Sequence, residues 1–446
     1  MRPFNQVTRV LHPELDRNYP VVVRGDGVWV EDSTGRRYLD AMSGGSMALT
    51  LGHGRRDLAG AAREQGGKLS YLHNERLTSP PQERLARELV ALAPEGFTRV
   101  HFVTGGAEAN EAALRLARSY HVDRGEPQRV RIISPAQAYH GCTVATLSLT
   151  GRPGLWGHYE PYLIDNLHLP PSTEHFDPTG AGALAELDRL LEETGPDTIS
   201  VYFSEVVGAA ALPSHSPPQL FWEGLAERRE KHGFLIAFDE VVTGMGRTGD
   251  WFAASRLPFV PDIIATAKGL GAGYTAIGAT LCHERVYEAI ASGSRRFPLG
   301  HTWNGAPLPC AVGIKVLDTL RAEGLVEHVR ERGPKLRDQL EEALADVAMV
   351  REVRGHGYLL GVEYSDPDEP GSFLASELGV AARIDDACME NGLITLSTQP
   401  TRDGYAGDQS LFAPSFTATD AELDEMVERF AASVRSVAHR LEEVAV

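Results

Sequence analysis

Cysteine is scarce in this sequence, and its four cysteines lie far apart. None of Cys142, Cys282, Cys310 and Cys388 belongs to a Cys-x-x-Cys pair. This spacing excludes zinc ribbons and dithiol redox motifs, and no metal site is predicted. Isolated thiols of this kind fit a reducing cytoplasm, which is where we expect the protein to be located.

Long apolar runs and an excess of positive charge are also missing. No run approaches the roughly 20 apolar residues of a membrane helix, and residues 1–6 lack the apolar core of a signal peptide. The formal net charge of −18 argues against nucleic acid or an anionic membrane as a partner. It does not exclude a local basic pocket for a phosphate.

What is present is ordinary globular composition, with 42% hydrophobic and 23% charged residues. A chain of 446 residues is too long for one simple core. The length therefore favours two domains, or one large α/β domain with additions.

Strands and helices alternate between about residues 98 and 282, which predicts a mostly parallel sheet. One preceding helix, over Ser79–Leu92, starts at a pair of prolines, and another over Phe221–His232 is amphipathic. The expected strands are Arg99–Val103, Val130–Ser134, Ile199–Phe203, Phe234–Val241 and Ile277–Cys282. Residues 151–197 are interpreted as surface.

The two ends of the chain have a different pattern. Residues 21–40 predict a small antiparallel meander, because short β-rich runs are separated by Gly-Asp-Gly and Ser-Thr-Gly turn signals. The glycine-rich stretch Met42–Gly54 predicts a loop near a site, or a simple connector. From about residue 316 helices flank short strands, and a last helix is expected over Asp420–Val437, which indicates a separate α+β domain.

Two stretches in the middle carry the strongest chemical signal. Phe234–Val241 is an almost wholly apolar run that ends in Asp239 and Glu240, and Ala265–Gly269 contains Lys268. Open α/β sheets bind ligands at the carboxyl ends of such strands. A carboxylate and a lysine at strand ends suit pyridoxal 5′-phosphate (PLP), with a Schiff base on the lysine and the acid at the pyridinium nitrogen. On these stretches alone, a solvent-facing acid and lysine is the simpler interpretation.

Two further motifs are open to two interpretations each. In Thr104–Glu111 a strand meets a glycine pair and then a helix, which leaves backbone amides free for a phosphate or forms only a tight turn. Tyr139 and His140 follow another strand. The aromatic ring there stacks on a flat cofactor or belongs to the core.

Taken together, these stretches resemble the class III PLP-dependent aminotransferases of fold type I, from about Val21 to Glu428. The most specific part is Phe238–Gly249, followed by Lys268, which lies 29 residues after Asp239. The resemblance implies a large domain with a mostly parallel seven-stranded sheet and a smaller α+β domain built from both chain ends. The implied boundaries are 1–59 and 316–446 for the small domain and 60–315 for the PLP-binding domain.

The resemblance also implies the roles of the ring-binding residues. Lys268 carries PLP as a Schiff base, and Asp239 keeps the ring nitrogen protonated. Val241 presses on one face of the ring, and Tyr139, next to His140, stacks on the other.

The remaining cofactor contacts follow from the same resemblance. The amides of Gly106 and Ala107 bind the phosphate, and Thr302 reaches the phosphate of the other subunit, which implies a homodimer with shared active sites. Glu205 matches a glutamate near the cofactor hydroxyl or the substrate. The alternative for Glu205 is a strand-end acid paired with an arginine.

The sequence departs from the family where relatives bind a substrate carboxylate. Leu411 and Ala406 occupy positions where arginine is common, and a strong clamp needs a bidentate guanidinium. Arg402 in the adjacent loop is a substitute clamp or a solvent-facing arginine; Trp29 and Trp303 are the other candidate substrate residues. Our hypothesis is that one substrate is an amine or carbonyl compound without an α-carboxylate, for example an amino sugar or another specialised metabolite.

The function expected from all of this is amino-group transfer from an amine or amino acid donor to an aldehyde, ketone or 2-oxo acid, in a ping-pong cycle. Another PLP reaction on the same fold, namely an aminomutase, decarboxylase or elimination reaction, is the alternative. A PLP-binding protein without turnover is a third interpretation, against which the intact Lys268 and Asp239 argue.

Overall fold

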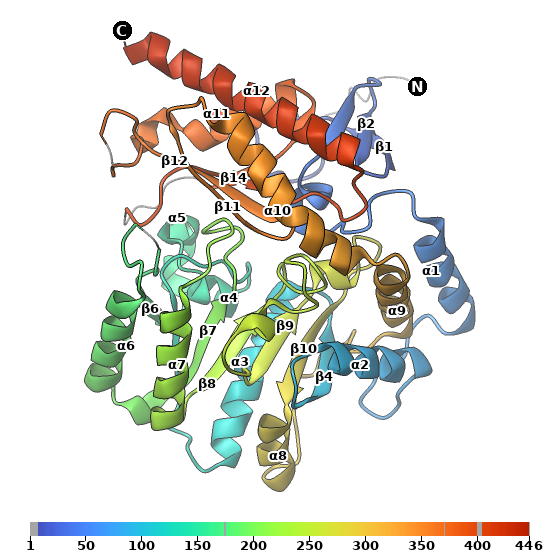
Figure 1. Ribbon diagram of the computed structural model, residues 1–446. Coiled ribbons are helices and arrows are strands. Elements are labelled where there is room, and N and C mark those ends of the chain that lie inside the picture. The colour runs from blue at the N-terminus through green and yellow to red at the C-terminus, as the bar shows by residue number, and fades with distance from the viewer. Residues whose placement is uncertain (1–7, 174, 370, 399–403, 446) are drawn as a thin grey trace.

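The computed structural model describes residues 8–173, 175–369, 371–398 and 404–445. A seven-stranded sheet with the order β4-β10-β9-β8-β7-β5-β6 forms the lower part of the molecule in Figure 1. Its strands are β4 (Phe97–Val103), β5 (Arg131–Pro135), β6 (Leu167–Leu169), β7 (Ile199–Glu205), β8 (Leu235–Asp239), β9 (Ile263–Thr266) and β10 (Gly278–His283). Among the described strands of this sheet, β10 alone runs opposite to the others, so the expectation of a mostly parallel seven-stranded sheet is confirmed.

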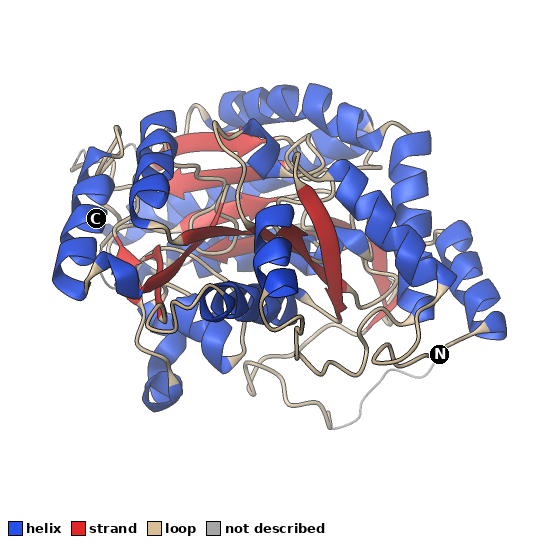
Figure 2. Cartoon of the chain, turned by 90° about the horizontal axis from the view of Figure 1, so that it is seen from below, coloured by secondary structure: helices blue, strands red, loops and turns tan. Residues whose placement is uncertain are grey.

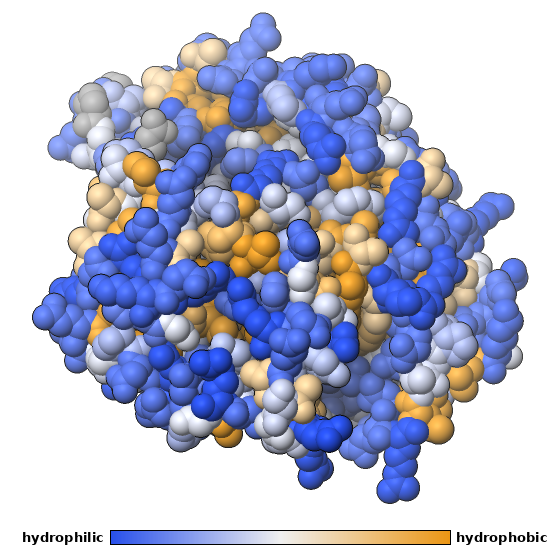
Figure 3. All heavy atoms as spheres, turned by 60° about the horizontal axis from the view of Figure 1, so that its bottom comes forward, coloured by the Kyte–Doolittle hydropathy of each residue, from blue (hydrophilic) through white to orange (hydrophobic). Residues whose placement is uncertain are grey.

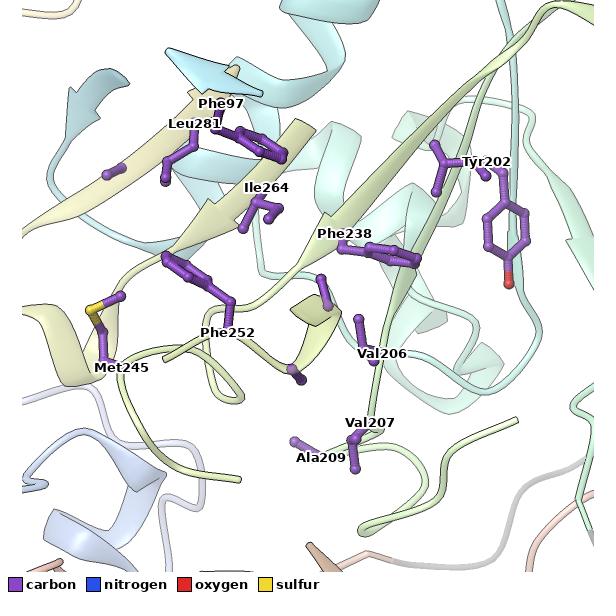
Figure 4. Close-up of a cluster of buried hydrophobic side chains, with 14 of the residues drawn as sticks. Phe97, Tyr202, Val206, Val207, Ala209, Phe238, Met245, Phe252, Ile264 and Leu281 are labelled. Atoms are coloured by element: carbon purple, nitrogen blue, oxygen red, sulfur yellow. The ribbon is translucent and has the colours of Figure 1, made fainter. Parts of the chain in front are cut away.

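Strand β8 is apolar throughout because both faces of the sheet are covered. Ile236 and Phe238 pack into the core on one face, and Leu235 and Ala237 pack on the other, since successive side chains of a strand alternate. Figure 4 shows Phe238 in the first core, together with Phe252 on the loop that follows. Seen from below, helices lie on both sides of the strands (Figure 2).

The helices that surround this sheet begin and end close to the sequence signals. Ser79 caps the helix after it, its Oγ accepting from the Gln82 amide, and the prolines occupy the first helical turn as predicted. The helices are α1 (Arg56–Lys68), α2 (Pro80–Leu92), α3 (Gly106–Asp123), α4 (Val144–Leu149), α5 (Pro153–Trp156), α6 (Ala181–Thr194), α7 (Gln219–His232), α8 (Glu284–Ser292) and α9 (Pro307–Ala322). The interpretation of residues 151–197 as surface missed the edge strand β6, which is only three residues long.

The chain ends meet at the top of Figure 1, where the first strands lie close to the last helix. The meander β1 (Val22–Asp26), β2 (Trp29–Asp32) and β3 (Arg37–Asp40) is antiparallel as predicted, and β13 (Leu393–Ile394) adds to β3 in parallel. A second sheet has the order β11 (Val350–His356), β12 (Leu359–Tyr364), β15 (Gln409–Phe412) and β14 (Leu396–Thr398). Helices α10 (Leu325–Leu344), α11 (Val380–Glu390) and α12 (Asp420–Ala445) cover these sheets. The boundaries at residues 59/60 and 315/316 stay a prediction.

The surface turned forward in Figure 3 is largely hydrophilic, with apolar side chains gathered near its middle. Among the described residues, no helix has both the length and the apolar character required to cross a membrane. In the same part of the chain, no three His, Cys, Asp or Glu side chains gather in a way that would hold a metal ion.

Candidate active site

A cavity of about 310 Å³ lies at the carboxyl ends of the parallel strands, where open α/β sheets bind ligands. It collects most of the residues that the sequence singled out. The predicted cofactor residues that line it are Gly106, Ala107, Tyr139, His140, Glu205, Asp239, Val241 and Lys268. Ala48 also lines it, so the glycine-rich stretch after β3 does approach the site.

Asp239 ends β8 with 5% of its surface exposed. Its Oδ2 accepts from Asn110 Nδ2 at 2.7 Å and lies 2.9 Å from His140 Nδ1. Its Oδ1 accepts from the Val241 amide at 2.9 Å. These three partners fix the position of both carboxylate oxygens relative to the cavity.

Asn110 is a site residue that sequence reasoning missed. It lies fully buried on α3 and also donates to the carbonyl of His140 at 2.7 Å, so one amide positions both His140 and Asp239. The His140 ring is packed edge-on against Phe203 at 4.9 Å. The available signal was an asparagine among the buried residues of α3, which are otherwise alanine and leucine apart from His121 near the end of the helix.

Glu240, the second acid after β8, faces away from the cavity and holds the loop that follows. It is fully buried and accepts from the amides of Ala253 and Ala254 and from the Thr243 hydroxyl, each at 2.8 Å. Burial raises the pKa of Glu240 to about 7. The two consecutive acids therefore have separate tasks, since Asp239 faces the ligand cavity and Glu240 organises the loop that carries Val241.

Arg247 in the same loop connects the sheet to both chain ends. Its Nη1 donates to the carbonyls of Tyr358 and Pro414 at 3.1 and 2.6 Å, and its Nη2 donates to Ser43 Oγ at 2.9 Å. Complete burial lowers the pKa of Arg247 to about 9. The sequence showed this arginine within a motif, but its partners are far away in the chain and were not foreseeable.

Lys268 follows β9 in a backbone conformation that non-glycine residues rarely adopt, with φ at 32°. Its carbonyl accepts from the Ala272 amide at 3.0 Å, and the Leu270 amide donates to the Ala267 carbonyl at 2.7 Å, which closes a tight turn. A left-handed residue costs about 1–2 kcal/mol. Such strain is typical of a functional site that the surrounding structure holds in place.

The Lys268 amine lies at the cavity without a hydrogen bond or ion pair among the described residues. Burial lowers the pKa of Lys268, and the charges of Asp239 and Glu205 oppose this effect, while Arg247 adds to it. A lowered pKa increases the unprotonated fraction of the amine, which is the nucleophilic form.

Glu205 ends β7 beside Asp239, because the two strands are parallel neighbours. Its carboxylate accepts from the amides of Tyr139 at 3.2 Å and Ala209 at 3.0 Å. Burial raises the pKa of Glu205 to about 7. The alternative of an arginine partner finds no support in the part of the chain that the structure describes, where no ion pair involves Glu205.

The start of α3 offers free amides to the cavity. The first intrahelical hydrogen bond runs from the Ala109 amide to the Gly105 carbonyl at 3.0 Å, so the amides of Gly106 and Ala107 precede it. A Cβ at Gly106 would lie 2.7 Å from Val241 Cγ1, so only glycine lets this helix approach Val241. The helix N-terminus there is suited to a phosphate.

These groups fit PLP part by part. Lys268 is available for the aldehyde, Asp239 for the ring nitrogen, Tyr139 and Val241 for the ring, and the α3 amides for the phosphate. Each lines the same cavity.

Other predicted residues lie away from this cavity within one chain. The Trp29 indole donates to Glu422 at 3.2 Å, and its ring contacts the guanidinium groups of Arg37 and Arg429. It packs on α12 and does not line the cavity. Arg402 lies outside the described residues.

Thr302 and Trp303 lie on an exposed loop. The Thr302 carbonyl accepts from Tyr71, and Trp303 is 51% exposed with its ring packed against the edge of Tyr71 at 5.2 Å. Trp303 lines a second, mainly apolar cavity of about 260 Å³ that shares Thr104 and residues 275–277 with the first. The two cavities are thus neighbours.

The positions where relatives commonly have arginine are buried here. Leu411 lies within β15, fully buried and paired with Gly361 and Leu396, and Ala406 is also buried. Neither Leu411 nor Ala406 is among the residues that line the cavity containing Lys268.

Comparisons with known proteins match aminotransferases over most of the chain. The sequence profile of the class-III aminotransferase family matches residues 12–434. An uncharacterized aminotransferase of Bacillus subtilis, YodT, is 32% identical over 97% of this chain and 99% of its own length. A probable aminotransferase of Mycobacterium tuberculosis is 38% identical over 77% of this chain and 75% of its own.

The solved structures that this chain resembles are also transaminases. A thermostable (S)-enantioselective omega-transaminase from Thermomicrobium roseum has a TM-score of 0.88 and 35% identity, with 96% of both chains covered. A transaminase from the marine bacterium Virgibacillus has a TM-score of 0.89 and 31% identity, with 95% of this chain and 94% of that chain covered.

Proposed function

Because the chain belongs to the class III family of PLP-dependent aminotransferases, we propose that Lys268 is the residue that binds PLP covalently and that Asp239 faces its ring nitrogen. The protein is a transaminase of fold type I, and it moves an amino group from a donor to a carbonyl acceptor in a ping-pong cycle. The observation that carries the residue assignment is that adjacent strands β8 and β9 bring Asp239 and Lys268 to one cavity.

Lys268 and Asp239 have different roles in amino-group transfer. Bound PLP supplies an electron sink for the carbon that loses its proton. Lys268 Nζ would take that proton from the substrate carbon and deliver it to C4′ of the cofactor, since its lowered pKa leaves the amine able to act as a base. The Asp239 carboxylate, held by Asn110 and His140, places negative charge beside the ring nitrogen.

A single half-reaction tests the proposed activity against the other PLP reactions. Purified holoenzyme is mixed with L-alanine, L-glutamate or a primary amine, and the cofactor and products are analysed. Transamination gives pyridoxamine phosphate together with the carbonyl product of the donor. Carbon dioxide or an elimination product with PLP regenerated would instead show a different reaction.

The substrate in one half-reaction is an amine or carbonyl compound without an α-carboxylate. The buried Leu411 and Ala406 support this, as does the cavity lining, in which Lys268 is the only lysine or arginine among the described residues. One solved neighbour, at 29% identity and a TM-score of 0.88, is an omega-transaminase variant engineered for synthesis of bulky amines. Turnover of a panel of amines, amino sugars and α-amino acids tests this; strict preference for α-amino acids in both half-reactions would refute it.

The active enzyme is a homodimer in the cytoplasm. The exposed Thr302 and Trp303 and the apolar cavity beside the PLP site support an interface there, through which Thr302 would reach the phosphate in the other subunit. All four cysteines are free, as in a reducing compartment. Sedimentation at the mass of a single chain in the active preparation would contradict the dimer.

The charge of Glu205 gives a pH-dependent prediction. Above about pH 7 Glu205 is ionised, and its charge raises the pKa of Lys268. Glu205→Gln removes this charge, so the Lys268 amine deprotonates at lower pH. We expect the rate at which PLP attaches covalently to the apoenzyme to reach half its maximum about 0.5–1 pH unit lower in the variant.

The control is built into the same titration. Below about pH 5 Glu205 is protonated in the unmodified protein, so the attachment rates of the two proteins should converge. A midpoint that moves to higher pH, or does not move, would show that Glu205 does not act on Lys268 through its charge.

A further inference from the structure

A larger cavity, of about 710 Å³, lies apart from the PLP site, and we call it the β11 cavity. Its lining comes from the loops after β6 and β7 of the lower sheet in Figure 1 and from β11 and β12 of the upper sheet. No described residue lines both this cavity and the cavity that contains Lys268. Its volume is within the usual range of small-molecule sites.

Strand β11 presents charged side chains to this cavity in an irregular pattern. Arg351, Glu352, Arg354 and His356 all line it. In a regular strand Arg351 and Glu352 would point to opposite faces, because successive side chains alternate. The pairing register with β12 shifts between Val350 and Glu352, so Arg351 lies at a bulge. A bulge re-aims a side chain, and this one adds Arg351 to the lining that Glu352 already belongs to.

Arg351 contributes a positive charge to the β11 cavity. Its Nη2 donates to His175 Nδ1 at 2.6 Å, and His175 is neutral because a guanidinium only donates and the ring nitrogen must accept. The guanidinium carbon lies 5.7 Å from the centre of the Phe373 ring. Arg351 Nη1 is buried without a hydrogen-bond partner. Within the part of the chain that the structure describes, no ion pair neutralises Arg351.

The two glutamates of the cavity share one arginine. Arg354 Nη1 donates to Glu363 Oε2 at 2.6 Å and to Glu352 Oε2 at 3.0 Å. Two carboxylates and one guanidinium leave this cluster with one negative charge at neutral pH. Glu363 is buried, whereas the Glu352 side chain is 36% exposed, so Glu352 is the acid that a ligand can reach.

The buried histidines of the lining add no charge at neutral pH. Burial lowers the pKa of His215 to about 3, and the charges of Arg354 and His356 add to this effect. Burial also lowers the pKa of His356. The described lining therefore carries one unneutralised positive charge, on Arg351, and one negative charge, in the glutamate cluster. A ligand with one charge of each sign matches both.

The loop after β7 separates the β11 cavity from the PLP site. Ser214 and His215 line the β11 cavity, whereas Ala209 and Ala210 line the PLP site. The Gly208 amide donates to the His215 carbonyl at 2.7 Å, and the Ser214 amide donates to the Gly208 carbonyl at 2.8 Å, which closes the loop. A ligand in the β11 cavity would contact the same closed loop that forms a wall of the active site.

We propose that the β11 cavity is a second binding site, for a zwitterion of the amino-acid type, with the ligand carboxylate at Arg351 and the ammonium group at Glu352. Both contacts are charge-assisted hydrogen bonds, which are about twice as strong as neutral ones. Lys268 does not line this cavity, so the ligand is bound there without being transaminated. A ligand with only one of the two charges leaves one cluster unmatched.

The probe is N,N-dimethylglycine, a zwitterion whose tertiary amine cannot form a Schiff base with PLP. It is titrated by calorimetry into the holoenzyme before and after treatment with aminooxyacetate, which occupies the PLP cavity. We expect one site per chain that persists after this treatment. Its affinity should exceed that for acetate or for trimethylamine, which carry one charge each, by at least about tenfold.

Two variants test the two charges separately. Arg351→Gln removes the positive charge, and Glu352→Gln removes the negative charge while its amide oxygen can still accept from Arg354. Each should lower the affinity for N,N-dimethylglycine about tenfold or more, and the absorption of bound PLP shows that the variant is folded. The matched control is Arg435→Gln, because Arg435 pairs with Asp346 at 2.8 Å on the surface; it should bind the probe like the unmodified enzyme.

Absence of binding to the unmodified holoenzyme would overturn the proposal. Binding that disappears after aminooxyacetate treatment would place the probe in the PLP cavity and overturn it as well. Equal affinity for acetate and N,N-dimethylglycine would contradict a zwitterion site, as would undiminished affinity in Arg351→Gln or in Glu352→Gln. If one of these variants does not fold, the other still decides.

Discussion

Replacing Lys268 with alanine is expected to lower kcat by at least about 10³-fold. The variant loses both the amine that binds PLP and the only lysine or arginine among the described residues that line the cavity. PLP should remain associated through the α3 amides and Asp239, without a covalent bond. The measurement is steady-state transamination, together with mass spectrometry of the intact chain after reduction.

Lys315→Ala is the matched control, because Lys315 is a partly exposed lysine that lies 3.6 Å from Asp57 on the protein surface. It should retain normal activity and covalent PLP. Activity of Lys268→Ala within tenfold of the unmodified enzyme would end the assignment of Lys268 as the covalent and proton-transferring residue.

Replacing Asp239 with asparagine is expected to lower kcat about 10²–10³-fold while PLP stays bound. Asparagine removes the negative charge beside the ring nitrogen. It also directs an NH₂ group at a site where Asn110, His140 and the Val241 amide all present donors, so at least one donor loses its acceptor. The measurement is kcat with saturating donor, and the absorption of bound PLP reports occupancy.

Two further variants separate charge from shape. Asp239→Glu keeps the charge and should recover part of kcat. Asp262→Asn alters another buried acid, which accepts from the Ile236 amide at 2.8 Å and pairs with Arg285. It should lower stability and leave kcat of the folded enzyme unchanged. Near-normal kcat in Asp239→Asn would contradict the electrostatic role.

The sequence predicted the parts of the site that depend on local pattern. The apolar strand β8 with its terminal acid and the lysine after β9 were recognisable because strand burial and strand ends leave a linear signature. Parallel pairing then brings their ends together. The glycine pair before α3 was recognisable for the same reason, and the structure adds the cause for Gly106, the close approach of Val241.

What the sequence did not reveal depends on contacts between distant segments. Asn110 reaches Asp239, and Arg247 reaches Tyr358, only after the chain has folded. Trp29 was named as a candidate substrate residue, and the structure shows its indole donating to Glu422 on the last helix. Periodicity carries no information about such pairings, since it describes only which face of an element is buried.

The pairing of β13 with β3 shows the same limit at the level of fold. Both strands are short, and neither sequence specifies its partner. The resemblance to a family implied that the two chain ends meet, and the structure shows through which residues they do, Leu39 and Leu393 among them.

The most direct test of the account is borohydride reduction of the holoenzyme, followed by proteolysis and mass spectrometry. The tag should appear on the peptide that contains Ala265–Gly269, with the added mass on Lys268. A tag on any other lysine, or a holoenzyme that stays unlabelled while it transaminates, would contradict it.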